Sequence, residues 1–293
     1  MQQTKRWVIG ICLFFCTATA WASDIARLPF YEAHQGDKQI FILGTMHVGE
    51  TNTELRPEIK EALTKSSKLV QELSTDEMLR SGLTMLTMMC SDACLRRQIS
   101  EASYQKLAAG SGAMLASLGA LEQMPAWMVS TILASSDYEK AGYTAMGGTE
   151  LKLKSLWGSR ATVGLETAEE QLSIFAEMSD SVQREMLESY INTPEEKRLA
   201  MVKKMYGLWQ RGDAEAIYQW YLQMSKEEGL SSTMVSEIDT QLIVKRNRLF
   251  VERLQPHITS GKPVFLAVGA LHLGGPQGVL ALLKKQGYSI SAR

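Results

Sequence analysis

Residues 39–49 read Gln-Ile-Phe-Ile-Leu-Gly-Thr-Met-His-Val-Gly, an apolar run that ends in a Gly-x-x-His-x-Gly turn. A near copy, Val-Phe-Leu-Ala-Val-Gly-Ala-Leu-His-Leu-Gly, occupies residues 264–274 close to the end of the chain. An apolar strand that stops at glycine places the next polar side chain at the carboxyl edge of a sheet, where open α/β sheets bind their ligands. Because two of the four histidines, His47 and His272, occupy matched turns, we interpret them as functional rather than packed residues.

Two acidic residues follow the same pattern. Residues 69–73 form a short predicted strand that carries Glu72 near its end, and residues 162–167 form another that carries Glu166. A predicted helix over 53–65 joins the strand before His47 to the strand over 69–73, and such a crossover should be parallel and right-handed. The sequence therefore predicts that His47, Glu72, Glu166 and His272 share one edge of a sheet.

The remaining pattern predicts an α/β fold. We expect a central mixed sheet of two pseudo-repeats with flanking helices, opened by a hairpin over 29–43 and closed by a strand over 288–291. Further helices are predicted over 234–255 and 276–286, and a Met-rich helical insertion over about 75–160. We interpret its methionines as adaptable core, with a pliable binding surface as the alternative. No linker divides residues 23–293, which are predicted to form a single domain.

The first 22 residues have the features of an export signal. Lys5 and Arg6 precede an apolar run over 7–15, and Ala20-Trp21-Ala22 fits the small-x-small cleavage pattern, so we expect cleavage after Ala22 and a periplasmic or secreted protein. No second hydrophobic span follows, so no stable membrane insertion is expected after cleavage. Without the two leader cations, 29 lysines and arginines face 32 acids, a formal net charge of −3. This balance does not favour nucleic acid as a partner.

Two cysteines leave with the predicted leader, Cys12 and Cys16, and two stay, Cys90 and Cys94. A close, even pair in an exported chain predicts a disulfide. A regular helix would make that bridge awkward, so a break at Ser91-Asp92 is expected. Two free, packed thiols are the alternative.

The four residues of the predicted edge form a reasonable ligand set for a divalent metal. Imidazole and carboxylate ligands together suit Mn, Co or Zn. A bound metal would lower the pKa of a water and polarise a carbonyl. Either Glu72 or Glu166 can instead be the general base, and the sequence leaves that choice open.

The chain also resembles a known family. The turns Gly44-Thr45-Met46-His47 and Gly269-Ala270-Leu271-His272 are similar to the signature of the TraB/PrgY/GumN family, which is related to the Tiki proteases, erythromycin esterase and ChaN. Gly164-Leu165-Glu166-Thr167 resembles its middle motif, and Arg246-Asn247 resembles its Arg-Asn pair. The resemblance spans about residues 29–291 and implies a sandwich of two pseudo-repeats with the site between them.

The resemblance implies two functions, and a third hypothesis comes from a different class of protein. The Tiki branch implies a metal-dependent protease with His47 and His272 as ligands and with Glu72 and Glu166 as ligand or base. The esterase branch implies a metal-independent hydrolase in which His47 is the general base and Glu72 orients it. The third is a non-catalytic protein that binds a peptide or haem.

The remaining expectations concern the Arg-Asn pair and the partners. Arg246 and Asn247 are expected to hold a carboxylate or an oxyanion, unless Arg246 pairs with an acid elsewhere. The expected substrate is a peptide or a small molecule, and the oligomeric state is left open.

Overall fold

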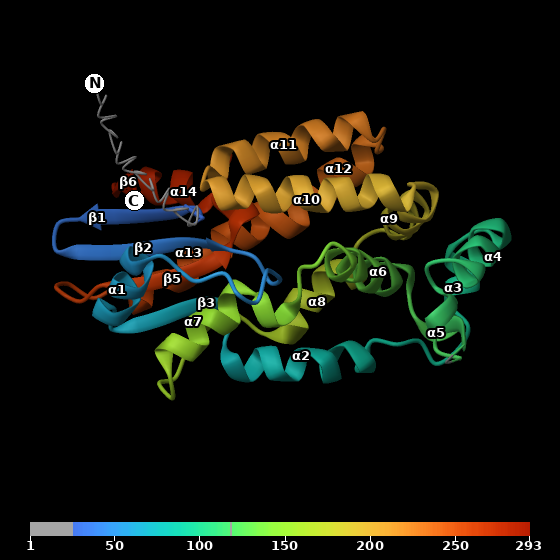
Figure 1. Cartoon of the computed structure of the whole chain (residues 1–293), viewed down its shortest axis with the longest axis horizontal. Helices are drawn as coiled ribbons and strands as arrows, with labels where there is room; N and C mark the ends of the chain where they lie inside the picture. The colour runs from blue at the N-terminus through green and yellow to red at the C-terminus, as the bar shows by residue number, and fades with distance from the viewer. Residues whose placement is uncertain (1–25, 118) are drawn as a thin grey trace, which may run out of the picture.

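A computed structural model describes residues 26–117 and 119–293 (Figure 1). The predicted leader, with Cys12 and Cys16, lies outside the described residues. Within the described ranges, no helix combines the length and the apolar character needed to cross a bilayer.

The sheet has six strands in the order β4-β3-β5-β2-β1-β6. Strands β4, β3, β5 and β2 run parallel to one another, whereas β1 is antiparallel to both of its neighbours, β2 and β6. The predicted α/β class with a mixed sheet is thereby confirmed. The strand bounds are β1 Phe30–Gln35, β2 Lys38–Thr45, β3 Lys68–Leu73, β4 Val163–Glu166, β5 Val264–Gly269 and β6 Ser289–Ala292.

The two strands of the repeated motif lie next to each other at the centre of this sheet. Strands β2 and β5 pair in register from Ile40 opposite Val264 to Thr45 opposite Gly269. Both are covered on both faces, because side chains of each strand belong to two separate apolar clusters. Such strands read as continuous apolar runs rather than as alternating ones. The two Gly-x-x-His turns therefore leave the sheet side by side at its carboxyl edge.

Helices pack around the sheet and extend well beyond its carboxyl edge (Figure 1). Helices α2 to α7 lie between β3 and β4 in the sequence, and α8 to α13 lie between β4 and β5. The helix bounds are α1 Pro57–Lys65, α2 Thr75–Thr87, α3 Leu95–Gln98, α4 Glu101–Ala109, α5 Ala113–Ser117, α6 Ala126–Lys140, α7 Thr149–Trp157, α8 Ala168–Ala176, α9 Asp180–Asn192, α10 Glu195–Arg211, α11 Ala214–Glu227, α12 Ser232–Ile238, α13 Arg246–Leu254 and α14 Val279–Lys285.

The helix predicted over 234–255 is present as one continuous helical stretch from Ser232 to Leu254, but its middle part is not α-helical. Helix α12 ends at Ile238, and α13 begins only at Arg246, with a π-helical segment at Asp239–Lys245 between them. A π-helical turn adds a residue to the helical turn and is frequent at functional sites. Here it rotates the following residues relative to a regular helix and so sets the direction in which α13 presents Arg246.

Two other predicted helices are shorter than expected. The predicted helix over 53–65 begins at Pro57, because proline fits the first turn of a helix. The predicted helix over 276–286 begins at Val279, after Gly278.

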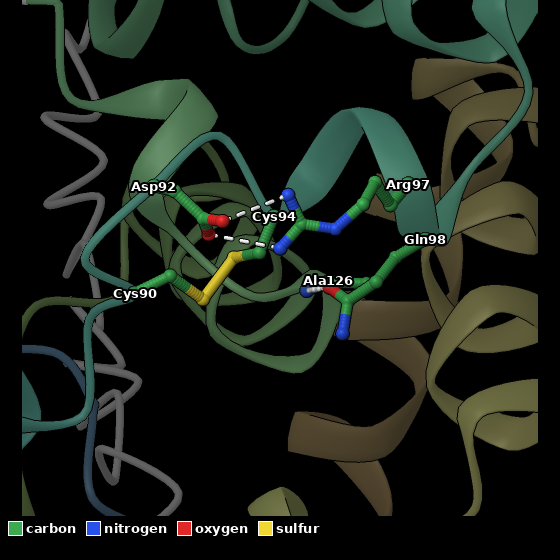
Figure 2. The surroundings of a disulfide bond; sticks show 6 residues. All are labelled: Cys90, Asp92, Cys94, Arg97, Gln98 and Ala126. Carbon is green, nitrogen blue, oxygen red and sulfur yellow. Dashed lines mark hydrogen bonds and ion pairs between the residues drawn. A yellow bond between two sulfur atoms is a disulfide. The ribbon is translucent and has the colours of Figure 1, made fainter.

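The loop between α2 and α3 is closed by the predicted disulfide (Figure 2). Cys90 and Cys94 are joined with a Cα–Cα distance of 6.2 Å. Helix α2 ends at Thr87 and α3 starts at Leu95, which supplies the expected break in the helix. Arg97 donates to both carboxylate oxygens of Asp92 inside this loop, at 2.8 and 3.0 Å. The bridge therefore fixes a local turn.

Removal of the disulfide should lower the free energy of unfolding only modestly. Five residues lie in the closed loop, and chain entropy gives such a short loop only about 2 kcal/mol of stabilisation. The double variant Cys90→Ser, Cys94→Ser should lose about that much in urea unfolding, and the reduced wild type should match it. Peptide mapping that finds two free thiols in the purified protein would contradict the bridge.

Candidate functional site

The four strand-end residues lie at one edge of the sheet but form two separate groups. Glu72 and Glu166 are buried at the ends of β3 and β4, and His272 is buried in the short turn after β5. These three side chains converge on the guanidinium of Arg246. His47, which follows β2, is exposed and pairs with a different residue.

Arg246 joins both glutamates. Its Nη2 donates to Glu72 Oε2 at 2.6 Å and to Glu166 Oε1 at 2.5 Å, while its Nε donates to Glu166 Oε2 at 3.2 Å. Gln171 donates from its amide to the same two carboxylates, at 2.8 Å to Glu166 and 3.3 Å to Glu72. Because the guanidinium geometry matches a carboxylate in two-pronged contacts, the pairing fixes both side chains. Arg246 therefore pairs with the acids of the predicted site itself rather than elsewhere in the helical layer.

The hydrogen bonds of His272 define its protonation state. Arg246 Nη1 lies 3.0 Å from His272 Nε2, and a guanidinium can only donate, so Nε2 must accept. The proton then sits on Nδ1, which donates to Asn247 Oδ1 at 2.7 Å. The Asn247 amide in turn donates to the carbonyl of Gln277 at 2.9 Å. His272 is thus a neutral imidazole, and burial lowers its pKa to about 4.

The two glutamates have different electrostatic environments. Burial raises the pKa of Glu72, but Arg246 and His272 oppose it, and the result is a pKa lowered to about 2. The backbone N–H of Gly269 also donates to Glu72, at 2.6 Å. For Glu166, burial outweighs Arg246 and raises the pKa above its ordinary value. One guanidinium therefore holds Glu72 firmly ionised and Glu166 less firmly.

His47 is held by Glu150, a residue that the sequence analysis did not identify. His47 Nδ1 lies 3.0 Å from Glu150 Oε1, with 70% of the His47 side chain exposed and 9% of the Glu150 side chain. The charge of Glu150 raises the pKa of His47, although water around the exposed ring weakens the interaction. Burial raises the pKa of Glu150, but the charge of His47 and its hydrogen bond outweigh burial and lower that pKa below its ordinary value.

Two glycines bring Glu150 to this position. The loop before α7 pairs with the His47 turn through Gly49 and Thr144. A Cβ atom on Gly147 would lie 2.0 Å from the carbonyl oxygen of Gly49, and one on Gly148 would lie 2.3 Å from that of His47. Only glycine allows the two backbones to approach so closely. The Gly-Gly pair before a helix is the sequence signal that could have identified Glu150.

His47 and Glu72 line the same cleft of about 280 Å³. Glu150, Gln71 and Gln171 also line it, and Met78 and Leu151 add apolar walls. The Gln71 side chain is buried, and its amide nitrogen has no hydrogen-bond partner among the described residues. A buried donor without a partner is costly, so this nitrogen is available for an acceptor in the cleft. Glu166 and Arg246 border a separate cavity of about 470 Å³.

The predicted metal ligands do not fit a shared ion in this arrangement. His272 Nε2 and both buried carboxylates point at Arg246, so the guanidinium lies where these three groups would meet an ion. In the two described ranges, no group of three or more His, Cys, Asp or Glu residues is placed to hold a metal. Metal dependence stays a prediction that no observation here supports.

Removal of the central cation should destabilise the fold. Arg246→Met leaves two buried carboxylates without their cation, and breaking a buried pair in this way costs about 3–5 kcal/mol. The loss should shrink between pH 7 and pH 5, because the unpaired carboxylates then take up protons and become neutral. Urea unfolding at both pH values measures it.

The matched control is Arg253→Met. Arg253 pairs with Glu170 at the surface and donates to the carbonyl of Leu165 at 2.7 Å, so its loss should cost only about 1–2 kcal/mol. Equal losses for the two variants, or a loss at Arg246 that does not change with pH, would contradict this account.

Nearly all of the described chain matches one known family. The sequence model of the TraB/PrgY/gumN family matches residues 29–292, which include every strand and both histidine turns. No curated protein and no solved structure matches the chain. The chain belongs to the TraB/PrgY/gumN family.

Proposed function

We propose that this protein is a hydrolase of peptide or ester bonds that uses His47 as its proton-transfer group and needs no metal. One observation carries the proposal: an exposed imidazole in a cleft is anchored through one nitrogen by the buried carboxylate of Glu150. In its neutral form His47 donates from Nδ1 to Glu150 and keeps Nε2 for a water. An imidazole held in this way acts as a general base and then as a general acid.

The other polar groups of the cleft support the same chemistry. Gln71 can donate its unpartnered amide N–H to a substrate carbonyl, where negative charge develops during attack by water. Glu72 lies in the same cleft as a fixed anion and stabilises the imidazolium that forms on His47. Arg246, Glu166 and His272 hold Glu72 in place and do not contact the cleft themselves. They are positioning residues in this proposal.

Substitutions of His47 and Glu150 should separate proton transfer by His47 from the effect of Glu150 on the pKa of His47. His47→Gln should lower kcat/KM by about 10²-fold or more, the usual size of an acid–base contribution. Glu150→Gln should also lower kcat/KM and should move the rising limb of the pH–rate profile to lower pH. The shift has this sign because Glu150 raises the pKa of His47, and a general base works only once it is deprotonated.

The assay measures the rate at which the purified protein hydrolyses libraries of fluorogenic peptides and aryl esters. His257→Gln is the control, because His257 lies in the turn after α13 and does not line the cleft. Unchanged rates in His47→Gln would remove His47 from the mechanism. A lower rate in Glu150→Gln with an unmoved pH profile would reduce Glu150 to a structural role.

Metal dependence is tested separately. A metal bound by His272 together with Glu72 requires Arg246 to leave both residues, because its guanidinium occupies their facing atoms. We expect activity to survive chelation and dialysis. Loss of activity that Mn, Co or Zn restores would instead support the metal-dependent protease that the family resemblance implies. Haem or peptide binding without turnover would support the non-catalytic alternative, and a Soret band on adding haem would identify that ligand.

A further inference from the structure

A further cavity lies in the helical layer and is lined mainly by residues of α6, α9, α10 and α11. These helices lie beyond the sheet in Figure 1. The volume of this cavity is about 570 Å³, within the range of small-molecule sites. It shares no lining residue with the His47 cleft. Its wall is mainly apolar and includes five methionines, Met186, Met201, Met205, Met224 and Met234. We call it the methionine chamber.

Most polar atoms in the wall of the methionine chamber already have partners. The hydroxyls of Ser130 and Thr131 donate to the carbonyl of Trp127, at 2.9 and 2.8 Å. The buried carboxylate of Asp137 accepts from Arg198 Nε at 2.7 Å. A peptide in this chamber would leave most of its own backbone N–H and C=O groups without partners, which is costly. A hydrocarbon chain has no such groups. The wall of the methionine chamber therefore favours a hydrocarbon chain as its ligand.

A polar cavity of about 470 Å³ adjoins the methionine chamber. The two cavities share four lining residues, Ser189, Thr193, Glu228 and Leu230. The charged side chains that line the polar cavity have both signs: Arg184 and Lys197 are cations, and Glu185, Glu188 and Glu228 are acids. Lys197 and Glu228 already pair with each other at 2.7 Å, so the lining carries no large excess of either charge. Such a mixed lining favours a zwitterionic group over a purely anionic one.

We propose that the two cavities together bind a single-chain amphiphile, with its hydrocarbon chain in the methionine chamber and a zwitterionic head in the polar cavity. Methionine side chains are unbranched and flexible, so they adapt to the irregular outline of an alkyl chain. The site is independent of the hydrolytic cleft, and the proposal does not rest on the activity of His47.

The test measures binding of lauroyl-lysophosphatidylcholine to the purified protein by calorimetry, below the concentration at which this lipid forms micelles. We expect saturable binding of one equivalent and no binding of glycerophosphocholine, which has the same head without the chain. Ala134→Phe should weaken binding by about tenfold or more, because Ala134 is an exposed residue of the chamber wall and a phenyl ring there occupies the chain's space.

Two further variants keep the result interpretable. Met201→Gln keeps the size of the side chain but makes the wall polar, so it should weaken binding several-fold even if Ala134→Phe fails to fold. Leu156→Phe changes an exposed residue on α7 outside both cavities and should leave binding unchanged. Absence of saturable binding, equal affinity in Ala134→Phe and wild type, or binding of an apolar octapeptide in place of the lipid would each overturn the proposal.

Discussion

A buried guanidinium cannot stay in a protein interior without anions around it, and Arg246 satisfies this constraint by joining the ends of three strands. Its partners are Glu72 on β3, Glu166 on β4 and His272 after β5. Because these strands are neighbours in the sheet, one side chain from α13 fixes the geometry of most of its carboxyl edge. The π-helical segment before α13 presents Arg246 to that edge.

The same constraint divides the site into a buried, fully paired cluster around Arg246 and one exposed residue, His47. Glu72, Glu166, His272 and Arg246 satisfy one another and are all buried. His47 is the member of the predicted set that remains accessible, and its anchor comes from the loop before α7 rather than from the sheet. The guanidinium of Arg246 thus lies where the sequence analysis expected a metal ion. This division supports acid–base chemistry at His47, with Glu72 as the charged member of the buried cluster that lines the same cleft.

Much of this arrangement could be predicted from local sequence patterns. Apolar runs that end in Gly-x-x-His identify β2 and β5 and their common edge, because parallel central strands are buried on both faces. The acids at positions 72 and 166 follow from the same rule. The partners could not be predicted, because they depend on how distant segments meet. Glu150 reaches His47 only through the close approach of Gly147 and Gly148 to the backbone of the turn.

The position of Arg246 tests the central claim most directly. A crystal structure of the purified protein, grown with Mn²⁺, Co²⁺ or Zn²⁺ and examined for anomalous scattering, would locate both the guanidinium and any bound metal. We predict that Arg246 Nη1 stays about 3.0 Å from His272 Nε2 with no anomalous peak at the carboxyl edge. A metal coordinated by His272 with Glu72 or Glu166, and Arg246 displaced from all three, would contradict the account.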